Sequence, residues 1–180
     1  MSTIAGGPVR RYRPVSGLMI LVLLVAFPFR SNAADSTVRV QLDATKIGPR
    51  AVEGLTEPAV TRDYRNAWSS LAQALEVNSL DSIRGAFTGD SQRVLTATIT
   101  SQQKSGLHQR YLDQTHKLVA VFYAPEGDVI ELHDTAEYQQ EVLDGGKVIQ
   151  NERVTIHYVV LMTPSADGWV VRYLQAVPQF

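Results

Sequence analysis

The chain has 180 residues, of which 44% are hydrophobic and 19% are charged, so it is globular in composition and not generally disordered. Residues 1–33 hold four arginines and no acid, and the remainder, with 13 basic and 18 acidic residues, carries a net charge of −5. Such a domain lacks the cationic face that general nucleic-acid binding needs, and the absence of cysteine excludes disulfides and thiolate metal sites.

The N-terminal segment is typical of an export signal. The basic stretch VRRYRP (9–14) precedes the apolar run LMILVLLVAFPF (18–29), and residues 31–33 offer the small side chains that signal peptidase needs. The run is shorter than the ~20 residues of a membrane-spanning helix. We therefore expect a secretory signal peptide, residues 1–33, cleaved near Ala33, and a periplasmic or secreted protein. The alternative, favoured by Pro28 and Arg30 near the expected cleavage site, is a membrane anchor at residues 18–29.

Residues 34–55 are polar and contain Gly48, Pro49 and Gly54, which is typical of a linker. Within it, TVRVQLDA (37–44) alternates in polarity, which predicts one short strand.

Three helices are expected next. In the first, Thr56 is the expected N-cap, Pro58 lies in the first turn, and apolar residues recur at helical spacing: Val60, Tyr64, Ala67, Trp68, Leu71 and Leu75. A shorter helix follows Asn78 or Ser79 and ends at Gly89. Asp90 is the expected cap of a third helix that stops at Gly106.

After about residue 115 the hydrophobic period changes to two, and turn signals at 125–128, 144–146 and 163–168 separate four strands of an antiparallel meander. A three-residue loop at 144–146 places Leu132 opposite Tyr158, His133 opposite His157 and Glu137 opposite Arg153. This register sorts the hairpin into an apolar and a polar face. Leu118, Ala120, Phe122, Met162, Trp169, Val171 and Tyr173 are expected to extend the apolar face.

Asp134 is the principal candidate for catalysis, because it falls on the predicted apolar face. A carboxylate in apolar surroundings can act as a general base near neutral pH, and Tyr158 or Tyr173 could stabilise an oxyanion. The structural alternative is an acid that is hydrated or accepts hydrogen bonds from tyrosine hydroxyls.

Two further sites are considered. Tyr64 and Trp68 on the first helix, with Tyr138 and Phe122 on the sheet, could line a pocket for a small apolar ligand, or simply form core. His133 and His157 are close enough in the predicted register to share a metal ion with Glu131 as a third ligand, or they pack on a half-exposed face. His108 and His116 are expected at the surface.

The order of elements and the ending VTIHYVVLMTPSADGWVVRYLQ (154–175) resemble the nuclear transport factor 2-like superfamily over about residues 56–177. The resemblance implies an α+β fold in which three N-terminal helices pack on a curved, cone-shaped, four-stranded antiparallel sheet, residues 56–180. Some members are isomerases or cyclases with Asp, His and Tyr residues in the cone, and many others are non-enzymatic binding domains. No local motif of these enzymes matches this sequence.

We therefore expect an exported, non-enzymatic domain that binds a small apolar ligand or a protein partner through its cone pocket or sheet face, without a cofactor. The alternatives are a small extracytoplasmic isomerase, dehydratase or cyclase with Asp134 as general base, and a metal-binding module. The polar sheet face also carries apolar residues, which predict a homodimer: Val119, Val121, Tyr123, Val159, Leu161 and Val170. Contact with a membrane is expected only if the leader is uncleaved.

Overall fold

The structure, a computed structural model, describes residues 37–180, so the predicted signal peptide and the alternative anchor lie outside the described residues. Within residues 37–180, no helix is both long enough and apolar enough to span a membrane. The elements follow in the order β1 (Arg39–Asp43), β2 (Gly48–Pro49), α1 (Thr56–Val77), η1 (Asp81–Ile83), α2 (Gly89–Ser105), β3 (Leu107–Tyr123), β4 (Ile130–Asp144), β5 (Lys147–Ser165) and β6 (Gly168–Val177).

The long helix α1 buries the apolar face that its sequence predicts, with Val60, Tyr64, Ala67, Trp68, Leu71, Ala74 and Leu75 as its buried residues. Its N-cap is Leu55 and not Thr56, and no side chain caps this end. The helix ends at Asn78, which adopts the left-handed conformation with φ 52°.

The prediction of a second α-helix is wrong. Only the single 3₁₀ turn η1 forms there, although Ile83 and Phe87 are buried as expected. The backbone N–H of Thr88 donates to the Val171 carbonyl, and the Val171 N–H donates to the Ala86 carbonyl. Because these backbone groups pair with β6, the segment extends beside the sheet instead of continuing as a helix.

The sheet is mixed and not purely antiparallel. The predicted meander β3–β4–β5–β6 is present, and β1 and β2 pair with β3 in the parallel sense, giving the order β1-β3-β4-β5-β6 with β2 also beside β3. Val38 and Val40 are buried in the core. The short strand predicted within residues 37–44 is therefore confirmed, and it forms an edge strand of the sheet.

The β4–β5 hairpin differs in register from the prediction by two residues. Gly145 and Gly146 both have positive φ, which permits a two-residue turn with Asp144 opposite Lys147, and a bulge between Val142 and Leu143 shifts the pairing. A shift of two keeps every side chain on its predicted face but changes its partner. Leu132 therefore pairs with Val160, Asp134 with Tyr158, and Glu137 with Thr155, and the predicted Glu137–Arg153 pair is wrong.

Two more bulges reverse the facing of residues that the alternation placed on the apolar face. The face that packs on α1 is called the inner face here, and the opposite one the outer face. A register shift between Ala120 and Phe122 turns Tyr123 inward and leaves Phe122 39% exposed. A shift between Leu161 and Met162 pairs Tyr173 with Leu161, on the outer face.

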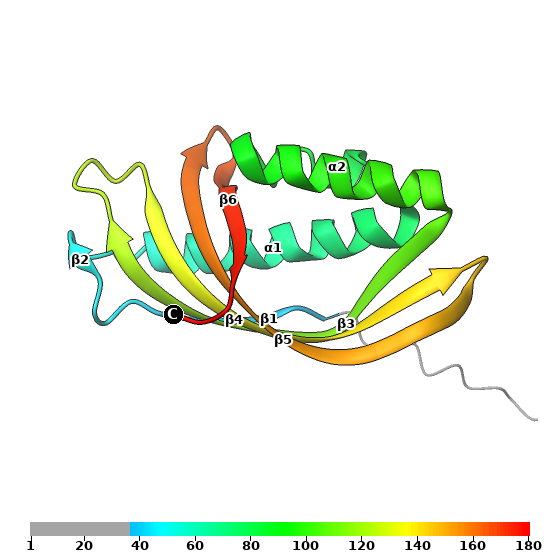
Figure 1. Cartoon of the computed structure of the whole chain (residues 1–180). Coiled ribbons are helices and arrows are strands. Elements are labelled where there is room, and N and C mark those ends of the chain that lie inside the picture. The colour runs from blue at the N-terminus through cyan, green and yellow to red at the C-terminus, as the bar shows by residue number, and fades with distance from the viewer. Residues whose placement is uncertain (1–36) are drawn as a thin grey trace, which may run out of the picture. The chain divides into compact units, whose positions relative to one another are not determined.

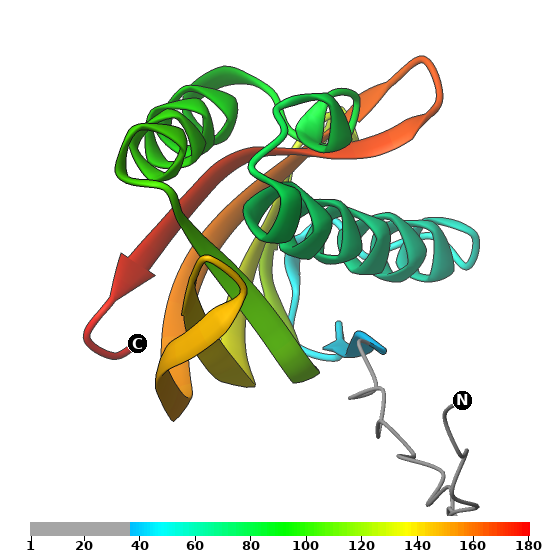
Figure 2. The same cartoon turned by 90° about the vertical axis from the view of Figure 1, so that its right-hand side faces the viewer.

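Figures 1 and 2 show the sheet bending around one side of α1, with α2 near β6 and the start of β3. The buried side chains of α1 share one core with inner-face residues that include Leu118, Ala120, Ile130, Leu132, Ala136, Val160 and Met162. The concave space between the two helices and the sheet is therefore filled by core over part of its length.

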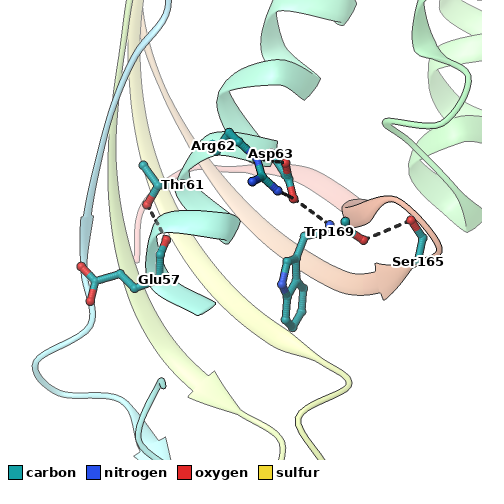
Figure 3. A network of polar contacts seen from close by, with 7 residues as sticks. Glu57, Thr61, Arg62, Asp63, Ser165 and Trp169 are labelled. Atoms are coloured by element: carbon teal, nitrogen blue, oxygen red, sulfur yellow. Dashed lines mark hydrogen bonds and ion pairs between the residues drawn. The ribbon is translucent and has the colours of Figure 1, made fainter. Parts of the chain in front are cut away.

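The turn between β5 and β6 is fastened to α1 by one carboxylate. Figure 3 shows Asp63 pointing from α1 towards the backbone of Trp169, whose N–H donates to Asp63 Oδ2 over 2.9 Å. Arg62 pairs with the same carboxylate at 2.8 Å. A Cβ on Gly168 would lie 2.5 Å from Asp63 Oδ2, so the close approach of turn and helix requires glycine there.

Candidate functional site

Asp134 lies at the middle of β4 on the inner face, opposite Leu118 of β3 and Tyr158 of β5. The Tyr64 hydroxyl on α1 donates to Asp134 Oδ2 over 2.8 Å, and Nδ1 of His116 on β3 lies 2.7 Å from the same oxygen. The tautomer of His116 that carries its proton on Nδ1 can donate to this oxygen. Tyr64, His116 and Asp134 form what we call the Asp134 cluster, which joins the helix to two strands.

The Asp134 cluster is closed to solvent, since all three residues are 0% exposed. The Trp68 ring packs on the His116 ring with centroids 4.3 Å apart. Asp134 Oδ1 and His116 Nε2 are buried without a hydrogen-bond partner. Burial, together with the nearby Asp134, raises the pKa of Tyr64 well above its usual range, so its hydroxyl remains a donor.

An open pocket lies beside this closed cluster. It has a volume of about 250 Å³ and is lined by residues of α1, α2 and the sheet: Trp68, Leu71, Leu75, Val94, Leu95, Thr98, Tyr111, Tyr158, Leu174 and Ala176. We call it the Trp68 pocket. No member of the Asp134 cluster lines it, and Trp68 contacts both, because its ring packs on His116 and also lies 5.5 Å from the Tyr158 ring.

The polar groups near the Trp68 pocket are mainly tyrosine hydroxyls. The Tyr158 and Tyr138 hydroxyls lie 3.3 Å apart, and the Tyr138 ring packs on the Tyr111 ring with centroids 4.5 Å apart. Burial raises the pKa of Tyr158 to about 12 and raises the pKa values of Tyr111 and Tyr138 well above their usual value. These hydroxyls therefore stay neutral at physiological pH and can hydrogen-bond an uncharged ligand.

The structure brings together, near Asp134, four members of the sequence-predicted set: Tyr64 and Trp68 from α1, and Tyr138 and Tyr158 from the inner face of the sheet. It does not bring Phe122 or Tyr173 to them, so the prediction that both lie on the apolar face was wrong. Phe122 is exposed, and Tyr173 lies half-buried on the outer face, where its hydroxyl donates to Gln175. The bulges described above are the physical reason in both cases.

The two histidines proposed as metal ligands are not directly opposite each other. His133 pairs with Val159, and His157 pairs with Thr135, whose hydroxyl lies 3.2 Å from His157 Nδ1. The ring of Phe180 stacks on His133 at 4.3 Å and meets His157 edge-on at 5.0 Å. Glu131 approaches His133 at 3.5 Å, but residues 37–180 contain no group of three or more His, Asp or Glu side chains placed to hold a metal ion.

The sequence-based prediction missed His116, which was expected at the surface and is fully buried. The signal for it was present, since His116, Leu118 and Ala120 alternate along the strand and all three face inward. Tyr111 was missed because a shift between Leu112 and Thr115 interrupts that alternation. Asp113, in this irregular segment, has φ 51°.

No known family model matches the chain, and no curated protein matches it. Among solved structures, the intermembrane-space region of the chloroplast protein ARC6 is similar, with a TM-score of 0.54 and 14% identity over 72% of this chain and 98% of that one. ActVI-ORFA from Streptomyces coelicolor has a TM-score of 0.45 and 16% identity over 68% of this chain and 96% of that one.

At these identities the similarity concerns the fold alone. The match to the ARC6 region shows a shared α+β fold, in which an open mixed sheet bends around helices. The helix count differs from the predicted one, because two α-helices and one 3₁₀ turn stand where three helices were expected.

Proposed function

We propose that residues 37–180 form a non-enzymatic domain that binds a small, mostly apolar ligand in the Trp68 pocket. The observation that carries this proposal is the pocket itself, which is open beside an otherwise closed core and is lined mainly by aliphatic and aromatic side chains. Ligand sites typically combine such a lining with a few polar groups that orient the ligand, and here Thr98 and Tyr158 provide hydroxyls. A volume of about 250 Å³ suits a small molecule.

The enzymatic alternative depends on Asp134 as a general base, and the geometry around this carboxylate argues against it. A general base has to come within hydrogen-bond reach of the proton that it abstracts. Asp134 is fully buried, two donors share its Oδ2, and none of the cluster residues lines the Trp68 pocket. We infer that Asp134 is a structural acid that fixes α1 to the sheet.

Ligand binding can be tested with N-phenyl-1-naphthylamine, an apolar dye whose fluorescence rises when it leaves water. The fluorescence of the dye is expected to rise when protein is added and to reach a plateau as the binding site saturates. Thr98→Trp places a large side chain at the pocket wall and should reduce the affinity at least tenfold, because the added ring occupies the space that the dye needs.

Arg93→Trp is the matched control, since Arg93 is exposed on the same helix and does not line the pocket. It should leave dye binding unchanged. If the protein gave no saturable enhancement, or if Thr98→Trp and Arg93→Trp bound the dye equally well, the Trp68 pocket would not be the binding site.

Two further parts of the proposal concern location and assembly. We propose export after cleavage near Ala33, supported by the basic, apolar and small-residue order of the leader, and mass spectrometry of the mature N-terminus tests it.

We also propose a homodimer through the outer face, supported by the exposed Val119, Phe122 and Phe180. Light scattering of the purified protein tests the second part, and a monomer at all concentrations would overturn it.

A further inference from the structure

A second cavity adjoins the Trp68 pocket and differs from it in chemistry. It has a volume of about 440 Å³ and lies between α2 and the first parts of β3 and the end of β4. Its lining consists of Ala97, Thr98, Ser101, Gln102, Ser105, Leu107, Gln109 and Val142. We call it the Gln102 groove. Thr98 lines both cavities, so they are neighbours along α2.

Gln102 is the unusual residue of this groove. It is only 7% exposed, and both its side-chain oxygen and its side-chain nitrogen are buried without a hydrogen-bond partner. Buried amide groups are nearly always hydrogen-bonded, because leaving them unpaired is costly. The next residue, Gln103, is exposed and nevertheless donates to the Asn78 carbonyl over 2.7 Å. Because Gln102 lines the groove, a rotation of its side chain would turn this unpaired amide towards a ligand there.

The other lining residues define what kind of ligand that is. The described lining contains no charged side chain, so a charged headgroup would lose its hydration without meeting a counter-charge. A carboxamide offers one acceptor oxygen and two N–H donors. The group that complements both atoms of Gln102 is therefore another neutral amide, whose oxygen accepts from Nε2 and whose N–H donates to Oε1.

We propose that the ligand is a neutral amphipathic amide, with its apolar chain in the Trp68 pocket and its amide head paired with Gln102. This inference rests on the proposed ligand-binding function and specifies the class of ligand. An alcohol of equal length can meet both atoms of Gln102 only through bent hydrogen bonds from its single oxygen, and a carboxylate can satisfy only Nε2.

The test measures the displacement of N-phenyl-1-naphthylamine by decanamide, decanol and decanoate, which share one chain length and differ in the head. With the unaltered protein, decanamide is expected to bind about two- to tenfold more tightly than decanol, the range of one added hydrogen bond, and decanoate most weakly. Gln102→Leu should lower the affinity for decanamide to that for decanol. It should change the affinity for decanol itself by less than about twofold.

Gln92→Leu is the matched control, because it makes the same change on α2 at a residue that lines neither cavity. It should keep the preference for decanamide. Gln102→Met, which nearly preserves the shape of glutamine, provides a second variant if Gln102→Leu folds poorly, and it too should lose the preference.

The outcomes separate the two proposals. If the dye binds but the unaltered protein does not prefer decanamide, or if the preference survives in Gln102→Leu and Gln102→Met, the amide inference is wrong and the proposed function stands. If the dye does not bind at all, the proposed function fails, and the inference that depends on it fails with it.

Discussion

Asp134 and Gln102 are both buried polar side chains, and they differ in what surrounds them. Asp134 is enclosed between α1, β3 and β5, and two donors from different elements converge on one of its oxygens. Gln102 lies at the wall of a cavity and has no partner. Asp134 has hydrogen-bond partners from two elements on Oδ2, although its Oδ1 is unpaired, and it lines neither cavity, whereas the unpaired amide of Gln102 belongs to a residue that lines the Gln102 groove.

Asp134→Ala is expected to lower the free energy of unfolding more than any other variant in this series. The substitution leaves the Tyr64 hydroxyl and His116 Nδ1 buried without an acceptor, and breaking such a buried pair typically costs about 3–5 kcal/mol of unfolding free energy. Urea unfolding followed by circular dichroism measures the loss.

Asp144→Ala is the control, because Asp144 is exposed beside the hairpin turn and should change stability by less than about 0.5 kcal/mol. A loss for Asp134→Ala as small as the control's would show that the Asp134 cluster does not hold α1 to the sheet.

Tyr64→Phe should have the next largest effect on stability. It removes one hydrogen bond to a carboxylate, which is worth about 1.5–3 kcal/mol, and leaves the ring in the core. Tyr158→Phe is the matched variant beside the pocket. It removes only a 3.3 Å contact between hydroxyls and should cost about 0.5–1.5 kcal/mol. Thermal and urea unfolding of both variants test the order, and the reverse order would contradict the assignment of structural and pocket roles.

Stability should also fall at alkaline pH, in a smaller step that Tyr158 helps to cause. Its pKa rises from the unfolded value of about 10 to about 12 on folding, so the fold favours the neutral form. The stabilisation that neutral Tyr158 contributes is fully present below about pH 9 and is lost as the pH rises through 12. Between pH 9 and pH 11, this residue should lower the free energy of unfolding by about 1 kcal/mol. Urea unfolding of the protein and of Tyr158→Phe at both pH values should show a shallower loss in the variant. Equal losses would mean that Tyr158 titrates normally.

The smallest effect is expected on the outer face, with Phe180→Ala. Phe180 is 53% exposed, although its ring stacks on His133. Exposed contacts of this kind contribute little, so the unfolding free energy should change by less than about 1 kcal/mol. Ligand binding in the Trp68 pocket should be unchanged, since the pocket opens on the other side of the sheet. A change in dye affinity would show that the two faces are coupled.

Much of the fold could be predicted because its signals are local. The helical spacing from Val60 to Leu75 identified the buried face of α1, and the alternation from Ile130 to Tyr138 identified the inner face of β4. Asp134 was placed on the correct face even though the hairpin register was wrong, because a shift of two residues preserves facing.

What could not be predicted depends on interruptions and on distant parts of the chain. A bulge needs only one extra residue and leaves no clear signal, which is why Phe122 and Tyr173 were assigned to the wrong face. The partners of Asp134 come from α1 and β3, 70 and 18 residues away, and the sequence does not reveal which donors will meet there. The Gln102 groove was not predicted for the same reason, because its walls come from three separate elements.

The position of Trp68 makes the protein its own optical probe. Of the two tryptophans, Trp68 lines the Trp68 pocket and packs on a histidine ring, whereas Trp169 lies at the start of β6 and packs near Tyr123. A Trp169→Phe variant would therefore emit from the pocket wall alone. Its intrinsic fluorescence would report occupancy by unlabelled compounds directly, so a library of neutral amides could be screened without any dye.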